Sequence, residues 1–288
     1  MRHIILSLLV FVFSISLFSQ AKGYWHGKER SLRYHPEGGD FVIVNGDRKF
    51  NRALYGTNTA FRVETGDVPE FGLFMPNMGG NMQLGLISGD KSLWLNDAEY
   101  IKSIYRPGAR IYEIKDPFIG NGKLTISVLA MADAEGMVIK IESQNLPSGI
   151  QLLTLFGGAS NKRFFRNGDL GVDDPNAFSL QPDACLDNEY QITSNQFVLN
   201  YAQSSKTGAR HTIAIFPENS QLKLGSPYQV MTPLHLWKSI AEKNKPVVLS
   251  KTSLTTDIYI ALKDQDNKPL SHAGLKKVLT MQKIKERK

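Results

Sequence analysis

The residues best suited to chemistry in this sequence are its tryptophans and one pair of neighbouring carboxylates. Trp25, Trp94 and Trp237 are its three tryptophans, and an aromatic ring of this kind can stack on the apolar face of a sugar. Asp67 and Glu70 lie close together in the chain, and glycoside hydrolysis uses two carboxylates that flank the scissile bond. These five residues are our candidates for carbohydrate contact.

A plainer interpretation is favoured for each of the five residues taken singly. Buried aromatic side chains commonly fill a core, and carboxylates at strand edges are commonly solvated. The sequence also offers Asp97, Glu99, Glu113 and Asp116, and nothing in it places any two carboxylates across a cleft. We therefore expect no catalytic residue in this chain.

Other kinds of site lack their ligands or their spacing. No His-Glu-x-x-His motif and no paired cysteines are present, so we expect no metal site. The acidic stretches Asp169–Asp174 and Asp264–Asn267 do not complete a calcium-binding loop, and turn formation explains them better. Gly120–Lys123 lacks phosphate-loop spacing and opens a predicted strand, so it is interpreted as a hairpin turn. We expect no cofactor.

The single cysteine and the charge distribution exclude two further classes. Cys185 cannot form an intrachain disulfide, so burial must stabilise the fold. Most of the formal net charge of +7 comes from basic residues between Lys276 and Lys288. The rest of the chain is nearly neutral, whereas a nucleic-acid-binding protein typically carries a basic face on its folded body. We therefore expect no nucleic-acid partner.

The first 20 residues are predicted to be a secretory signal peptide. A basic start is followed by an apolar run from Ile4 to Phe18 and then by small and polar residues. This run is short for a membrane span and suits a cleaved signal. We expect the mature protein to be periplasmic or secreted, with no membrane attachment after cleavage.

The elements that would position these residues are predicted to be almost entirely β-strands. Short runs rich in Val, Ile, Phe, Tyr and Thr alternate with Gly, Asn and Asp along the chain, which is typical of antiparallel strands. Asn45-Gly46 predicts a type I′ hairpin within Phe41–Phe50, and Asn121-Gly122 gives a second such signal. The predicted fold class is all-β, a large antiparallel two-sheet sandwich, with residues 21–264 as its domain.

Only two segments are predicted to be helical. One is a short helix within Leu234–Lys243, and the other is a helix over Ser271–Lys288 with an apolar stripe. A polar stretch from Asp264 to Pro269 separates the second helix from the strands, as a domain boundary would. Residues 265–288 are therefore predicted to be a basic helical connector.

Two stretches carry a resemblance to a known family. Tyr24–Phe41 with Asn45-Gly46, and Phe50–Gly56 with Phe61–Phe71 and Met75–Gly85, resemble the opening of the family called domain of unknown function 4450. The resemblance covers most of the mature chain and is most distinctive over residues 24–116.

The resemblance implies that the sandwich precedes a toroid of paired helices like those of secreted glycoside hydrolases that degrade complex glycans. Such a toroid needs on the order of 200 residues, whereas residues 265–288 are all that follow the predicted sandwich. We therefore expect the connector to be truncated and the chain not to be active alone, its expected partners being the toroid and a glycan.

Three hypotheses for function remain open. The first is a non-catalytic N-terminal sandwich module of a secreted glycoside-hydrolase-like, polysaccharide-degrading protein. The second is a free-standing periplasmic carbohydrate-binding module, which aromatic residues aligned on one sheet face would favour. The third is a mutarotase-like sugar-processing enzyme, which needs a histidine and a carboxylate converging in a concave pocket.

Overall fold

The computed structural model describes residues 33–47, 52–75, 78–160, 178, 180–202, 211–227 and 231–264. The chain divides into two units, Met1–Tyr34 and His35–Lys288, and all the secondary structure described below lies in the second. The predicted signal peptide, Trp25 and the predicted helix over Ser271–Lys288 fall outside the described residues. The assignment of residues 1–20, 21–264 and 265–288 to three segments therefore stays a prediction.

Two large antiparallel sheets make up the fold, as predicted. The first has ten strands, in the spatial order β1 (His35–Glu37), β2 (Asp40–Val44), β8 (Tyr100–Arg106), β9 (Ala109–Lys115), β10 (Lys123–Ala130), β11 (Gly136–Gln144), β18 (Ile258–Asp264), β15 (His211–Ile215), β14 (Gln196–Asn200) and β13 (Glu189–Thr193).

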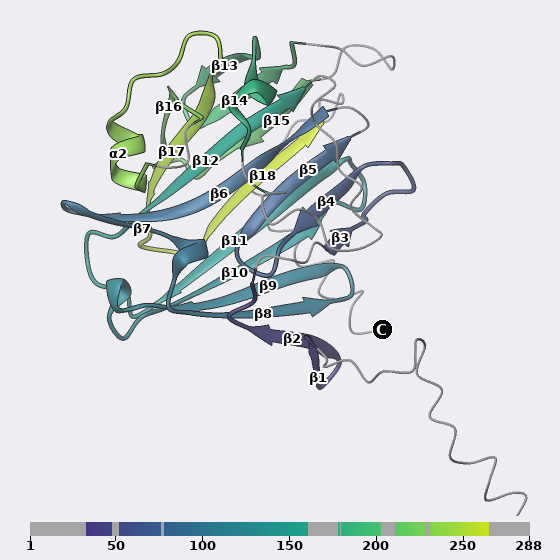
Figure 1. The fold of residues 1–288 in the computed structure, drawn as a ribbon, viewed down its shortest axis with the longest axis vertical. Helices are drawn as coiled ribbons and strands as arrows, with labels where there is room; N and C mark the ends of the chain where they lie inside the picture. The colour runs from purple at the N-terminus through teal and green to yellow at the C-terminus, as the bar shows by residue number, and fades with distance from the viewer. Residues whose placement is uncertain are drawn as a thin grey trace, which may run out of the picture. The chain divides into compact units, whose positions relative to one another are not determined.

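The second sheet has eight strands. Seven follow the order β16 (Gln221–Gly225), β17 (Val247–Ser253), β12 (Gln151–Ser160), β6 (Met78–Ser88), β5 (Glu70–Met75), β4 (Arg62–Thr65) and β3 (Arg52–Leu54), and the eighth, β7 (Lys91–Trp94), pairs with β6. Its centre is the long pair of β6 and β12, which stay in register from Ile87 opposite Gln151 to Met78 opposite Ser160 (Figure 1).

Burial differs sharply between the two sheets. In the ten-stranded sheet, buried residues alternate with more exposed ones, as in Gln196–Asn200 of β14. In the eight-stranded sheet, Met78–Ile87 of β6 and Leu152–Ser160 of β12 are buried without interruption. Alternation indicates one solvated face, and continuous burial indicates that both faces are covered. The eight-stranded sheet is therefore the inner layer of the fold.

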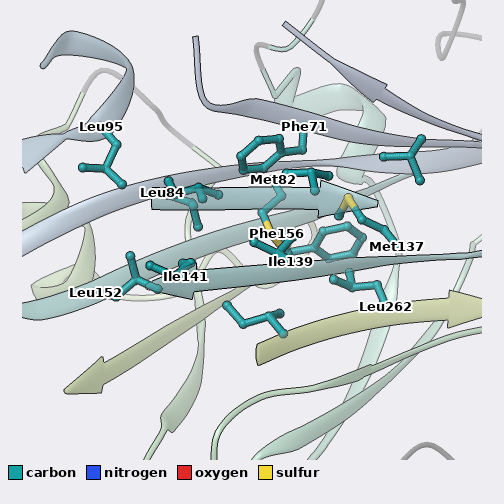
Figure 2. Close-up of a cluster of buried hydrophobic side chains, with 14 of the residues drawn as sticks. Phe71, Met82, Leu84, Leu95, Met137, Ile139, Ile141, Leu152, Phe156 and Leu262 are labelled. Atoms are coloured by element: carbon teal, nitrogen blue, oxygen red, sulfur yellow. The ribbon is translucent and has the colours of Figure 1, made fainter. Parts of the chain in front are cut away.

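The main core lies between the sheets. Figure 2 shows Phe71, Met82 and Phe156 of the eight-stranded sheet packed with Ile139 and Leu262 of the ten-stranded sheet in one apolar cluster. Full burial of such a side chain contributes about 1.5–3 kcal/mol. Extended strands put every second side chain on this face, as Leu124, Ile126 and Val128 of β10 show.

The described helical segments are short. They are α2 (Pro233–Lys238) and the 3₁₀ turns η1 (Leu95–Asp97), η2 (Pro117–Ile119) and η3 (Pro182–Cys185). α2 confirms the helix predicted within Leu234–Lys243, but it ends at Lys238 because the backbone at Ser239 is extended, with ψ 157°. Among the described residues, no helix is long and apolar enough to cross a membrane.

The hairpin predicted around Asn45-Gly46 is wrong. β2 ends at Val44 and pairs with β1 and β8 rather than with the chain that follows it. Asn45 does adopt a positive φ of 49°. Its side chain, however, accepts a hydrogen bond from the backbone amide of Ile101 at 2.8 Å and donates one to the carbonyl of Glu99 at 3.0 Å. The chain next forms β3 in the other sheet, so Asn-Gly here marks a crossing between sheets.

The second signal, at Asn121-Gly122, is partly confirmed. β9 and β10 do pair as neighbours, but the positive φ, 57°, belongs to Gly120 and follows η2. Because η2 lengthens the connection, it is not a two-residue type I′ turn. The sequence pattern predicts no strand over β3, β7 or β16, and within β6 it predicts a strand only over Gln83–Ile87.

Asp40 and Arg106 join the edge strand β2 to β8, and this pair gives a pH-dependent prediction. Arg106 donates from Nε and Nη2 to the two carboxylate oxygens of Asp40, at 2.8 and 2.6 Å. This hydrogen bonding lowers the pKa of Asp40 below its ordinary value of 3.8, against the opposing effect of burial. We expect Asp40→Asn to lower the free energy of unfolding by about 1 kcal/mol at pH 7.

The stabilisation by Asp40 is present above pH 3.8 and is lost as the pH falls through the lowered pKa of the folded state. Urea unfolding of the wild type and Asp40→Asn at several pH values measures this. The difference between the two proteins should shrink toward zero in strong acid, and a difference that stays constant with pH would contradict the assignment.

Candidate functional site

The structure brings two of the three candidate tryptophans to one apolar cluster. Trp94 ends β7 and Trp237 lies in α2, yet both are partly buried against the same buried side chains. That cluster includes Leu153, Leu155 and Leu249, which lie on the face of the eight-stranded sheet turned away from the main core. Their convergence depends on how α2 is attached to the sheet.

The start of α2 is fixed to β6 and β7 by specific contacts. Thr232 caps the helix by accepting a hydrogen bond from the backbone amide of His235, and Pro233 lies in the first helical turn. Threonine and proline are both favoured at these positions. The Pro233 ring lies against Gly85, where an added Cβ would come within 2.8 Å of Pro233 Cγ. A glycine at position 85 therefore lets the helix approach the sheet closely.

Two hydrogen bonds complete this attachment. Trp94 Nε1 donates to the carbonyl of Met231 at 2.9 Å, and the amide of Leu234 donates to Ser92 Oγ at 3.1 Å. The only hydrogen-bond donor of the Trp94 side chain is therefore used to hold the chain just before α2. Of the two tryptophans, Trp237 is the one whose polar edge has no such anchoring bond within the described structure.

Two lysines lie next to the Trp237 ring. Lys223 Nζ is 5.1 Å and Lys251 Nζ 4.8 Å from the ring centroid, within the usual range for cation–π contacts. Lys223 comes from β16 and lies opposite Leu249 of β17, while Lys251 lies two residues further along β17. Both lysines therefore rise from the same sheet face as the apolar cluster. We call Trp94, Trp237, Lys223 and Lys251 the tryptophan patch.

The charges of the patch are not balanced by carboxylates. Lys223 Nζ donates to the carbonyl of Ser239 at 3.1 Å, just beyond the end of α2, where a cation is favoured by the helix dipole. The Lys251 ammonium group lies over the ring of Trp237, and within the described residues neither lysine pairs with a carboxylate. Burial lowers the pKa of Lys223 from its ordinary value.

This arrangement suits binding rather than bond cleavage. A partly exposed indole offers an apolar platform for a sugar ring, and ammonium groups beside it can donate hydrogen bonds to ligand oxygens. Cys185, whose side chain belongs to the same apolar cluster, is fully buried, and burial raises the pKa of its thiol to about 12. A thiol in that state is not a nucleophile near neutral pH.

Asp67 lies inside the fold. Its side chain is fully buried, and Arg110 Nη2 of β9 lies 3.7 Å from Asp67 Oδ1. The same Arg110 nitrogen and the hydroxyl of Tyr112 each donate to the carbonyl of Gly66 at 2.8 Å. Because Gly66 and Asp67 form the turn between β4 and β5, this group ties the eight-stranded sheet to the ten-stranded one.

Glu70 is also buried, at 5% exposure. Its Oε1 accepts a hydrogen bond from Asn96 at 3.1 Å, and its backbone pairs opposite Gln83 of β6. The structure places neither Asp67 nor Glu70 in the tryptophan patch. The carbohydrate contact proposed for these two carboxylates stays a prediction, and their burial argues against it.

The described residues offer little to a mutarotase-like mechanism. None of His35, His211 and His235 contacts a carboxylate, and the Nδ1 atom of His211 is bonded to Asn200 at 2.6 Å. An open pocket of about 360 Å³ at one end of the sandwich contains Glu218 and Asp257 but no histidine. The part of the chain that is described also contains no group of three or more potential metal ligands.

Sequence reasoning missed the two lysines of the patch. The alternation in Leu222-Lys223-Leu224 could have placed Lys223 on the face opposite the two leucines. Ser250-Lys251-Thr252 is polar throughout and carries no such signal for Lys251. The meeting of both lysines with Trp237 was not accessible in the same way, because it depends on the docking of α2. The two tryptophans were chosen by residue type alone.

The fold defines the class of the protein, a large two-sheet antiparallel β-sandwich. The family model "Domain of unknown function (DUF4450)" matches residues 75–277. The chain therefore belongs to this family, and the resemblance inferred from the sequence is confirmed. The opening motifs before residue 75 lie outside the matched range.

Two solved structures share partial similarity with the chain. One is a bacterial glucoamylase complexed with acarbose, at 10% identity and a TM-score of 0.45, with 82% of this chain and 37% of that chain covered. The other is the α-N-acetylgalactosaminidase NagBb from Bifidobacterium bifidum in complex with GalNAc, at 11% identity and a TM-score of 0.41, with 89% and 39% covered. The chain thus spans under two fifths of either protein. No curated protein matches significantly.

The contacts of Arg110 and Tyr112 with the Gly66 carbonyl give a prediction that tests whether Arg110 has a structural role. Arg110→Met would leave the buried Asp67 without its guanidinium neighbour, and we expect a loss of about 3–5 kcal/mol in the free energy of unfolding. The matched control Tyr112→Phe removes one hydrogen bond to the same carbonyl and should cost about 1 kcal/mol. Urea unfolding measures both, and a loss in Arg110→Met no larger than in Tyr112→Phe would show that Arg110 does not tie the sheets together.

Proposed function

We propose that this chain is a non-catalytic N-terminal β-sandwich module of a secreted glycoside-hydrolase-like protein that degrades polysaccharides. In this proposal the module contacts glycan through the tryptophan patch. The observation that carries it is the convergence of Trp94 and Trp237, from distant parts of the sequence, on one face of the eight-stranded sheet.

The construction of the patch supports a binding role. α2 is fixed to the sheet by Pro233 against Gly85 and by the bond from Trp94 to Met231, so Trp237 is presented on a rigid support. A rigid aromatic platform loses little conformational entropy when a ligand stacks on it. The ring is only partly buried, which leaves area for a sugar.

The placement of the candidate carboxylates supports the non-catalytic part of the proposal. Glycosidases hold two carboxyl groups about 5–9.5 Å apart on either side of the bond to be cleaved. Asp67 and Glu70 are both buried, and Asp67 lies beside Arg110. We propose that hydrolysis belongs to the partner implied by the family resemblance, a helical toroid, and that the module works in the periplasm or outside the cell.

A free-standing carbohydrate-binding module is the second candidate, and the same observation favours it. Trp94 and Trp237 share one sheet face, which is the arrangement this hypothesis requires. The two candidates differ only in whether a toroid works with the module. Both predict glycan binding without hydrolysis by this chain.

Glycan binding should depend on Trp237. We expect the full chain to be retarded by at least one of soluble starch, arabinoxylan and polygalacturonate in affinity gel electrophoresis, without release of reducing sugar. Trp237→Ala should weaken the retardation about tenfold, equivalent to about 1.4 kcal/mol. Phe41→Ala, which removes an aromatic ring that is 51% exposed on the other sheet, should bind like the wild type.

Thermal unfolding of both variants verifies that they are folded before binding is compared. Equal retardation of the wild type and Trp237→Ala would contradict glycan contact at the patch. Release of reducing sugar by the purified chain would contradict the non-catalytic assignment.

A further inference from the structure

The two lysines of the tryptophan patch form a concentrated positive charge beside an aromatic ring. Both ammonium groups lie within about 5 Å of the same ring centroid, at 5.1 and 4.8 Å. Neither pairs with a carboxylate in the described part of the chain. An anion bound beside both ammonium groups would be attracted by each of them.

Lys251 is the more informative of the two lysines. Lys223 already has a structural role, because it donates to the Ser239 carbonyl at the end of α2. Within the described residues the Lys251 ammonium group donates no hydrogen bond and forms no salt bridge, and its one recorded interaction is with the Trp237 ring. The group can therefore donate hydrogen bonds to a ligand.

We propose that the tryptophan patch binds an acidic sugar, that is, a sugar ring bearing a carboxylate, with the ring against Trp237 and the carboxylate against Lys251 and Lys223. This inference rests on the proposed function and specifies its ligand class. In a uronic acid the carboxylate projects from the edge of the sugar ring. Both ammonium groups lie over the indole, about 5 Å from its ring centroid, so the carboxylate can meet them where the sugar ring contacts the part of the indole that they leave uncovered.

The test uses oligogalacturonide and its methyl-esterified form as probes for the full chain. The two probes have the same rings, but only the first carries carboxylates. In isothermal titration calorimetry at low salt, we expect the wild type to bind oligogalacturonide at least about fivefold tighter than the ester, as one exposed charge pair can provide. This preference should decline as added salt shortens the screening length.

Single-residue variants test whether the preference for the acid over the ester depends on Lys251. Lys251→Gln should weaken oligogalacturonide binding about fivefold more than it weakens ester binding, whereas Lys251→Arg should keep the preference. Lys115→Gln is the matched control, because Lys115 also lies over an aromatic ring, that of Tyr100 at 5.6 Å, but in the other sheet. It should behave like the wild type.

Three outcomes would overturn the inference. The first is equal affinity for the acid and its ester. The second is an effect of Lys115→Gln as large as that of Lys251→Gln, which would indicate diffuse charge attraction. The third is polyglutamate binding that is as tight as oligogalacturonide binding and equally sensitive to Lys251→Gln, which would indicate an acidic protein partner.

The design separates this inference from the proposed function. If Trp237→Ala weakens binding of the acid and the ester alike while Lys251→Gln changes neither, the preference for acidic sugars is wrong and glycan binding stands. If Trp237→Ala changes neither, both fail.

Discussion

The structure depends on the burial of the eight-stranded sheet on both of its faces. One face meets the ten-stranded sheet across the main core, which includes Phe71, Met82 and Phe156. The opposite face is covered in part by α2 and by the segment with Leu180 and Cys185. A sheet with both faces covered needs close-fitting layers, and glycines supply the space, as at Gly85 under Pro233 and Gly157 under Leu180.

The tryptophan patch is a consequence of this second layer. α2 is only a six-residue helix, which would not be stable by itself. Its position is set by the sheet through Gly85, Ser92 and Trp94. Asp67 and Glu70, the two carboxylates proposed as carbohydrate contacts, are buried in the interior, where Asp67 takes part in joining the sheets. The groups left near the surface are an indole and two ammonium ions, which are suited to holding a ligand.

Fold class could be predicted from the sequence because strand alternation is a local property. β10 and β14 show the expected period of two. Prediction of individual turns and strands failed where contacts between distant segments determine the structure. Asn45 adopts a positive φ but Gly46 does not, the Asn45 side chain hydrogen-bonds to β8, and the chain continues into the other sheet. β6 was recognised only in part because Gly79 and Gly80 carry no side chain to show a pattern.

The candidate site was predictable in its residue types and not in its assembly. Trp94 and Trp237 could be named as sugar platforms from their chemistry alone. That they share one sheet face, and that Lys223 and Lys251 join them, follows from the packing of a helix on a sheet, which no local pattern encodes. The burial of Asp67 and Glu70 likewise reflects the β4–β5 turn lying against β9, a contact between segments remote in sequence.

The central claim is that Trp237 contacts glycan while Trp94 holds the helix in place. The most direct measurement is the nuclear magnetic resonance spectrum of the indole N–H groups in chain labelled with ¹⁵N-tryptophan, with signals assigned from Trp94→Phe and Trp237→Phe. During titration with a glycan that the chain binds, the account predicts a shift of the Trp237 signal larger than that of Trp94, whose N–H is bonded to Met231. Binding that leaves the Trp237 signal unmoved would contradict it.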